Sequence, residues 1–179
     1  MKLRDVVIFS GARFEVPEGI QRIDHRATHG WQLRYGGTKL FSDFTPDGSG
    51  AARSLGKATR ELLARIAKLP APSKLQKEPS EHKSSDLPVG ISGPIVRTRH
   101  ATGLRDCSFL VSVPRYGQTP RRRTVYIGTE NTYTAEKYHA ALARAIEIRR
   151  EAEEAYQREV TRAKRAAGRA LRAAARQAD

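Results

Sequence analysis

Arginine and glutamine side chains occupy positions where one face of a strand would present them together. Gln32 and Arg34 alternate with large apolar residues in the run 31–35, so the polar side chains point one way and the apolar ones the other. Arginine can donate two hydrogen bonds to guanine, and glutamine can pair in the same way with adenine. Three consecutive arginines, at positions 121–123, are suited to contacts with phosphate groups. These residue types indicate nucleic-acid recognition.

The sequence carries no pattern typical of a catalytic or metal site. Cys107 is the only cysteine, which excludes an internal disulfide and any zinc site built on paired cysteines. His25 and His29 are four residues apart, but Gly30 and the lack of apolar periodicity place them in a turn. No Gly-rich phosphate loop, nucleophile elbow or HExxH motif is present. We therefore expect a protein that is not an enzyme and that needs no metal or cofactor.

The charge of the chain predicts a polyanionic partner. Its 179 residues include 33 Lys and Arg against 19 Asp and Glu, a formal net charge of +14. The excess lies in three separate blocks, with net charges of +5 in residues 1–69, +5 in residues 90–133 and +4 in residues 159–179. Such a distribution favours several contact surfaces over one charged tail.

The apolar pattern predicts no membrane span and no secretory signal. No run approaches the ~20 apolar residues that cross a bilayer, and the apolar run 6–9 near the start is too short for a signal peptide. Together with the single cysteine, this predicts an intracellular protein, located in the cytoplasm or nucleoid or in a nucleus. The oligomeric state is left open.

Two similar blocks of secondary structure flank a Pro- and Ser-rich linker at residues 70–89. Before it, strand-like runs at 20–23, 31–35 and 39–44 precede a helix with an apolar face from 51 to 69. After it, strand-like runs at 109–113 and 123–127 precede a helix that Thr134 can cap. The order predicts an α+β fold with two small modules, each a three-stranded antiparallel sheet packed on one helix.

The predicted organisation has five parts. They are an N-terminal extension (1–18), a first module (19–69), the linker (70–89), a second module (90–150) and a long basic C-terminal helix (151–179). The extension holds one or two further strand-like runs, at 6–9 and 13–16, that we expect to pack on the first module. The last helix can be a solvated face, a basic arm along DNA or a coiled coil. Together with the helix of the second module, which it continues, up to ~44 residues can be helical.

The run Thr124-Val125-Tyr126-Ile127-Gly128-Thr129, followed by Thr134-Ala135-Glu136, resembles the APETALA2/ethylene-response-factor (AP2/ERF) DNA-binding family. The family pattern leads from a strand with an aromatic–aliphatic–Gly–Thr step into a helix of the Thr-Ala-Glu type. The first module resembles a more diverged copy without the Gly-Thr step. The resemblance implies two tandem AP2-like domains, each a three-stranded sheet backed by one helix, with the open face of the sheet in the DNA major groove.

Polar side chains of both modules are then candidates for DNA contact. The candidates are Gln21, Arg22, Arg26, Gln32, Arg34, Lys39, Arg97, Arg99, Ser112, Arg115, Arg121, Arg122, Arg123 and Tyr126. Tyr126 lies between two apolar residues and is expected to face away from the helix. The resulting hypothesis is a double-stranded DNA-binding protein, acting as a transcriptional regulator or as an accessory protein of a mobile element or phage.

Composition alone leaves other readings. An RNA-binding or ribonucleoprotein component fits a basic, Arg-rich α+β chain as well as a DNA-binding protein does. A non-catalytic targeting half of a nuclease system is a third reading. The run 126–129 also resembles half of a GIY-YIG nuclease, but the segment 90–92 lacks the required tyrosine and no arginine lies between Thr129 and His139. We do not expect nuclease activity.

Overall fold

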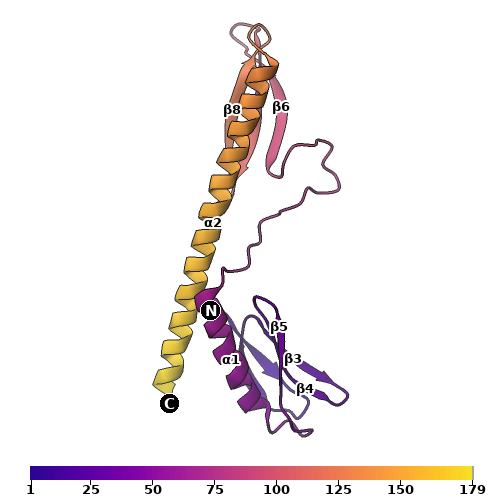
Figure 1. The fold of residues 1–179 in the computed structure, drawn as a ribbon, viewed down its shortest axis with the longest axis vertical. Coiled ribbons are helices and arrows are strands. Elements are labelled where there is room, and N and C mark those ends of the chain that lie inside the picture. The colour runs from indigo at the N-terminus through magenta and orange to yellow at the C-terminus, as the bar shows by residue number, and fades with distance from the viewer. Residues whose placement is uncertain (179) are drawn as a thin grey trace. The chain divides into compact units, whose positions relative to one another are not determined.

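The computed structural model describes residues 1–178 and has the α+β architecture that the sequence predicts. Three antiparallel sheets, of two, three and three strands, and two helices make up the fold (Figure 1). The chain divides into two compact units: Met1–Pro72 together with the helix from Val160 onward, and Ser73–Glu159. No helix in the described part of the chain is long and apolar enough to cross a lipid bilayer.

The first unit is built around the sheet β3–β4–β5, formed by Ile20–His25, Thr28–Arg34 and Thr38–Ser42. Helix α1 (Ala51–Lys68) covers one face of this sheet, as predicted from its apolar spacing. Trp31 and Leu33 of β4 are fully buried and pack with Leu62 and Ile66 of α1. The alternation seen in the sequence is thus confirmed: Arg34 lies on the opposite face and is exposed.

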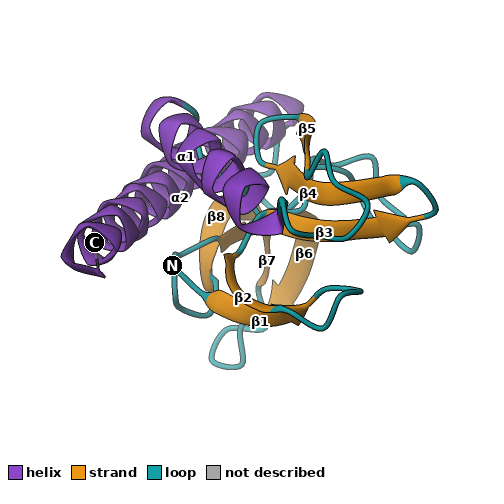
Figure 2. Ribbon diagram, turned by 90° about the horizontal axis from the view of Figure 1, so that it is seen from below, coloured by secondary structure: helices purple, strands orange, loops and turns teal. Residues whose placement is uncertain are grey.

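The N-terminal extension forms a hairpin of its own. Strands β1 (Leu3–Val7) and β2 (Arg13–Pro17) pair antiparallel and lie side by side in Figure 2. Val16 is fully buried in the first core, and the Phe14 ring makes an edge contact with Trp31, with 5.7 Å between ring centroids. The extension therefore packs on the first module as expected, but as two paired strands.

The second unit repeats the arrangement with the sheet β6–β7–β8, formed by Ile91–Thr98, Arg105–Val113 and Arg121–Thr129. Helix α2 (Ala135–Ala178) follows, and Thr134 caps its start by accepting a hydrogen bond from the backbone N–H of Lys137, as predicted. The core joins the strand residues Phe109, Val111 and Ile127 to Ala145 and Ile148 of the helix.

Matching glycines mark the same point in the two sheets. Gly19 and Gly90 each precede the first strand with a left-handed φ, of 101° and 79°, which an L side chain rarely adopts. The carbonyl of Gly19 accepts a hydrogen bond from the N–H of Arg34, and that of Gly90 accepts one from the N–H of Ser112, both at 2.7 Å. These bonds make Arg34 and Ser112 equivalent positions and support the tandem-repeat interpretation.

The 44-residue α2 confirms the predicted long C-terminal helix, and its last part has packing partners. Within the first unit, Lys164 forms an ion pair with Glu18 at 3.1 Å, and Thr161 accepts a hydrogen bond from the N–H of Ala71. Gly168 is buried, and a Cβ at this position would lie 3.1 Å from a methyl group of Ile66. One side of this segment therefore packs on α1, while its arginines at 162, 169, 172 and 176 are exposed, and the three alternatives for its role stay predictions.

Candidate nucleic-acid interface

The open face of the first sheet carries glutamine and one arginine. Gln21 and Gln32 are directly opposite each other on β3 and β4, on the side of the sheet away from α1. Arg34 lies two residues beyond Gln32, and its Nε donates a hydrogen bond to the Gln32 side-chain oxygen. Arg26 lies in the turn between β3 and β4, where it is exposed with a left-handed φ of 50°. These four candidates are accessible.

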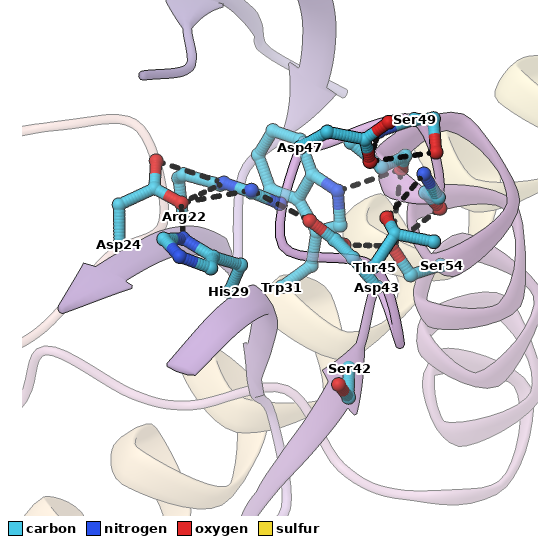
Figure 3. Close-up of polar contacts among 12 residues, drawn as sticks. Arg22, Asp24, His29, Trp31, Ser42, Asp43, Thr45, Asp47, Ser49 and Ser54 are labelled. Atoms are coloured by element: carbon cyan, nitrogen blue, oxygen red, sulfur yellow. Dashed lines mark hydrogen bonds and ion pairs between the residues drawn. The ribbon is translucent and has the colours of Figure 1, made fainter. Parts of the chain in front are cut away.

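Arg22 is not available for DNA contact, which corrects the sequence expectation. Its register partner is Trp31, so it lies on the side of the sheet that α1 covers. Its Nη2 is 2.6 Å from Asp43, whose side chain is fully buried, and 2.8 Å from Asp24 (Figure 3). The guanidinium also lies over the Trp31 ring, 5.0 Å from its centroid.

The surroundings of Arg22 keep it charged. Burial alone would lower the pKa of the guanidinium, but hydrogen bonds and charge attraction from Asp43 and Asp24 outweigh burial and raise that pKa. Asp43 is held in place from the other side by the Ser54 hydroxyl, which donates a 2.5 Å hydrogen bond to it from α1. The cluster therefore ties the sheet to the helix, and its role is structural.

Lys39 also lies on the helix side of its sheet, so its expected place on the open face is wrong. Its register partner on β4 is the buried Leu33. The side chain remains exposed at the edge strand β5, where its Nζ lies over the Phe41 ring, 5.2 Å from the centroid. Lys39 can meet an anion only at the edge of the sheet.

Two basic residues that were not among the sequence-based candidates lie next to the first open face. Lys2 and Arg4 line a cavity of about 380 Å³ together with Gln21 and Arg34. Arg4 also donates a hydrogen bond to the carbonyl of Ile20, which fixes it beside the sheet. Their spacing of two residues was a usable signal, because in an extended chain it puts both cations on one face.

The second open face carries more exposed cations. The cross-strand pairs on this side are Arg97 with Asp106, Ser112 with Arg122, and Ser108 with Tyr126. Tyr126 is 53% exposed, which confirms that it faces away from the helix. Arg99, just beyond β6, donates a 2.8 Å hydrogen bond to Asp106 from the same side. That hydrogen bond raises the pKa of Arg99.

The three consecutive arginines do not share one face. Val113 and Val111 are the register partners of Arg121 and Arg123, so these two point to the helix side, and only Arg122 lies on the open face. All three border a groove of about 650 Å³ between β8 and α2 that also contains Ile148 and Glu151. All three are exposed and remain accessible to phosphates. The expected place on the open face is therefore wrong for Arg121 and Arg123.

The remaining candidates lie near one end of the second sheet. Ser112 is half-buried, and its carbonyl accepts a hydrogen bond from Arg149 of α2. Arg115, in the connection between β7 and β8, is exposed and donates two hydrogen bonds to the carbonyl of Thr119. These hydrogen bonds stabilise the connection, while the Arg115 side chain remains exposed to solvent.

Among residues 1–178, no three His, Cys, Asp or Glu side chains lie close enough together to hold a metal ion. His29 is engaged with Asp24 at 2.9 Å and stacks near Phe9. Comparisons of the chain with protein-family models, with curated proteins and with solved structures gave no match. The chemistry of the site therefore has to be argued from the geometry of the two open faces.

Proposed function

We propose that this protein binds double-stranded DNA through the open faces of its two sheets, with the β6–β8 face as the principal contact. The observation that carries the proposal is that Arg97, Arg99 and Arg122 extend from the face of their sheet opposite the one on which α2 packs. Arg99 is the only one of the three with an ion-pair partner among the described residues.

The layout of the second open face suits a duplex. Arg122 and the pair Arg97 and Arg99 are at opposite ends of the face, six residues of β7 apart, which is ~20 Å at the usual rise per residue. Between them lie neutral side chains that are exposed or half-buried: Leu110, Thr124 and Tyr126. Cations at both ends can hold phosphates while neutral groups meet base edges and thymine methyls.

The resemblance to the AP2/ERF family supports the same use of the sheet. In both modules three antiparallel strands precede a helix that packs on one face, which is the order that the resemblance implies. A second module contributes through effective concentration, since one small module offers only ~600–1,000 Å² of contact. A regulatory or mobile-element role inside the cell, in cytoplasm, nucleoid or nucleus, is consistent with this proposal.

The decisive experiment is a competition among nucleic acids. The full chain is titrated into a labelled DNA duplex at two salt concentrations, with unlabelled duplex, single-stranded DNA and an RNA hairpin as competitors. We expect duplex DNA to compete best and log K to fall steeply with log salt, since each neutralised phosphate contributes a slope of about −0.9. Equal or better competition by the RNA hairpin would overturn the proposal in favour of RNA binding.

A further inference from the structure

An apolar groove in the first unit is separate from both open sheet faces. It has a volume of about 910 Å³ and lies between the β1–β2 hairpin, one side of α1 and the last turns of α2. Its apolar lining includes Leu3, Phe14, Leu55, Leu63 and Leu171. Leu3 is 39% exposed, and the other four are only partly buried. The groove therefore offers apolar surface that this unit leaves uncovered.

Helix α1 has a second apolar side that its own sheet does not use. Ala58, Leu62 and Ile66 form the buried side toward the sheet. The groove side is formed by small and apolar positions of the same helix: Ala52, Leu55, Gly56, Thr59 and Leu63. These five span about 16 Å along the axis, or three turns. Helix α2 covers part of this side, since a Cβ at Gly168 would lie 3.6 Å from Leu63, and the groove is the part that α2 leaves open.

Gly56 has no side chain, so the stripe on α1 is shallow at this position. Glycine is unfavourable inside a helix, and a Cβ built at Gly56 would meet nothing within 4 Å. The packing of the chain itself therefore does not require glycine there. With Ala52 one turn away, it leaves a shallow track in which the ridge of another helix can lie close to α1.

The charges around the groove determine the kind of occupant. Arg60, Arg172 and Arg176 lie on its rim, and none of them has an ion-pair partner among residues 1–178. Glu15 is the one acidic residue in the described lining. A second copy of this chain would bring a net charge of +14 to a basic rim, which is unfavourable. An acidic occupant is favoured.

We propose that this groove binds an amphipathic α-helix of an acidic protein partner. The apolar residues of the partner helix lie on the α1 stripe and against Leu171, and its carboxylates face the three rim arginines. This inference does not rest on DNA binding, because neither open sheet face contributes to the groove.

Three synthetic peptides of about 15 residues test the proposal. One is an amphipathic helix of leucine and glutamate, the second is a scramble of the same composition, and the third replaces glutamate by lysine. Each is labelled and titrated with the full chain by fluorescence anisotropy. We expect the first to bind at least about tenfold more tightly than its scramble, with no binding of the lysine peptide. The scramble controls for general attraction to a basic protein.

Two variants of the chain sharpen the test. Gly56→Leu fills the track with a good helix former and should weaken the amphipathic peptide about tenfold. The double charge reversal Arg60→Glu with Arg172→Glu should abolish binding of the glutamate peptide and allow binding of the lysine peptide. Val96→Leu, at an exposed apolar position of the second unit, is the control and should change nothing. Fluorescence of Trp31 checks that the first core stays folded.

Two results would overturn the proposal. In the first, the amphipathic peptide binds no better than its scramble, or both groove variants bind it as the wild type does. In the second, sedimentation equilibrium finds a dimer that Gly56→Leu dissociates, which would assign the groove to a second copy. DNA affinity should be the same in Gly56→Leu and in the wild type, so failure of this proposal and failure of DNA binding are distinguishable.

Discussion

The two modules share strand order and helix position but place their arginine–carboxylate pairs differently. In the first, Arg22 and Asp43 are buried, with side-chain exposures of 7% and 0%. In the second, Arg99 and Asp106 are 53% and 21% exposed. The first pair joins sheet to helix through Ser54, while the second stays on the open face. An arginine on a strand is therefore accessible to a ligand only where no buried acid on a neighbouring element forms an ion pair with it.

The helices of the modules also begin differently. Helix α2 has the side-chain cap of Thr134, whereas α1 begins after Gly50 without any side-chain cap. A Cβ on Gly50 would lie 2.0 Å from the carbonyl oxygen of Asp43, so only glycine fits this close approach. The first module therefore lacks a side-chain cap at the point where the backbone of Asp43 approaches the start of α1.

The largest difference in stability between the two modules is expected when the acid of each arginine–carboxylate pair is neutralised. Asp43→Asn leaves the buried Arg22 without its main partner and should destabilise the first unit by about 3–5 kcal/mol. Asp106→Asn should leave stability unchanged, because its pair with Arg99 is solvated. Urea denaturation is followed for the first unit by the fluorescence of Trp31, the only tryptophan, and for the second by the reactivity of Cys107, the only cysteine. Equal losses from both substitutions would refute the contrast.

Removing the arginine and glutamine side chains of each open face tests which module dominates DNA binding. Arg97→Ala, Arg99→Ala and Arg122→Ala combined should weaken duplex binding by about 100-fold, since each arginine contact with a base or phosphate contributes substantially. The matched set Gln21→Ala, Gln32→Ala and Arg34→Ala should cost about tenfold. Duplex titration by anisotropy measures both.

A control for total charge accompanies these sets. Arg144→Ala, Arg150→Ala and Arg158→Ala remove three exposed cations from α2, and should reduce duplex affinity much less than the open-face set does. If all three variants lose affinity in proportion to the charge removed, readout by the sheet faces is not supported.

Substitutions at the start of each helix are expected to give a smaller difference in stability between the two units. Gly50→Ala should cost about 1–3 kcal/mol, because the added methyl group must displace the backbone of Asp43. Thr134→Ala should cost about 1 kcal/mol through loss of the cap. Chemical denaturation with the same Trp31 and Cys107 signals measures each change in its own unit. A larger loss at Thr134 than at Gly50 would contradict the interpretation.

The smallest effect is a pH dependence of the first unit to which Asp24 contributes. Burial alone would raise the pKa of Asp24, but hydrogen bonds from Arg22 and His29 outweigh it and hold that pKa below its ordinary value of 3.8. A lowered carboxyl pKa stabilises the fold above pH ~4 and the contribution is lost as the pH falls through the folded-state value. We expect a loss of stability below about 1 kcal/mol between pH 5 and 3, and we expect Asp24→Asn to reduce it. An unchanged slope in this variant would exclude Asp24 as its source.

The sequence determined the order of elements and which residues alternate. Trp31 and Leu33 against Gln32 and Arg34 divided β4 into two faces, because successive side chains of a strand point to opposite sides. The same alternation groups Arg122 with Tyr126 and separates it from its two neighbours, so the correction at residues 121–123 was within reach of the sequence.

The tertiary structure decided which of the alternating side chains remain free. Asp43 is 21 residues from Arg22, and only the pairing of three strands beneath α1 brings the two charges together in a buried place where each requires the other. The last turns of α2 likewise gained packing partners that no local pattern contains, through Lys164 and Gly168. Periodicity is a property of neighbouring residues, whereas burial and ion pairing depend on segments far apart in the chain.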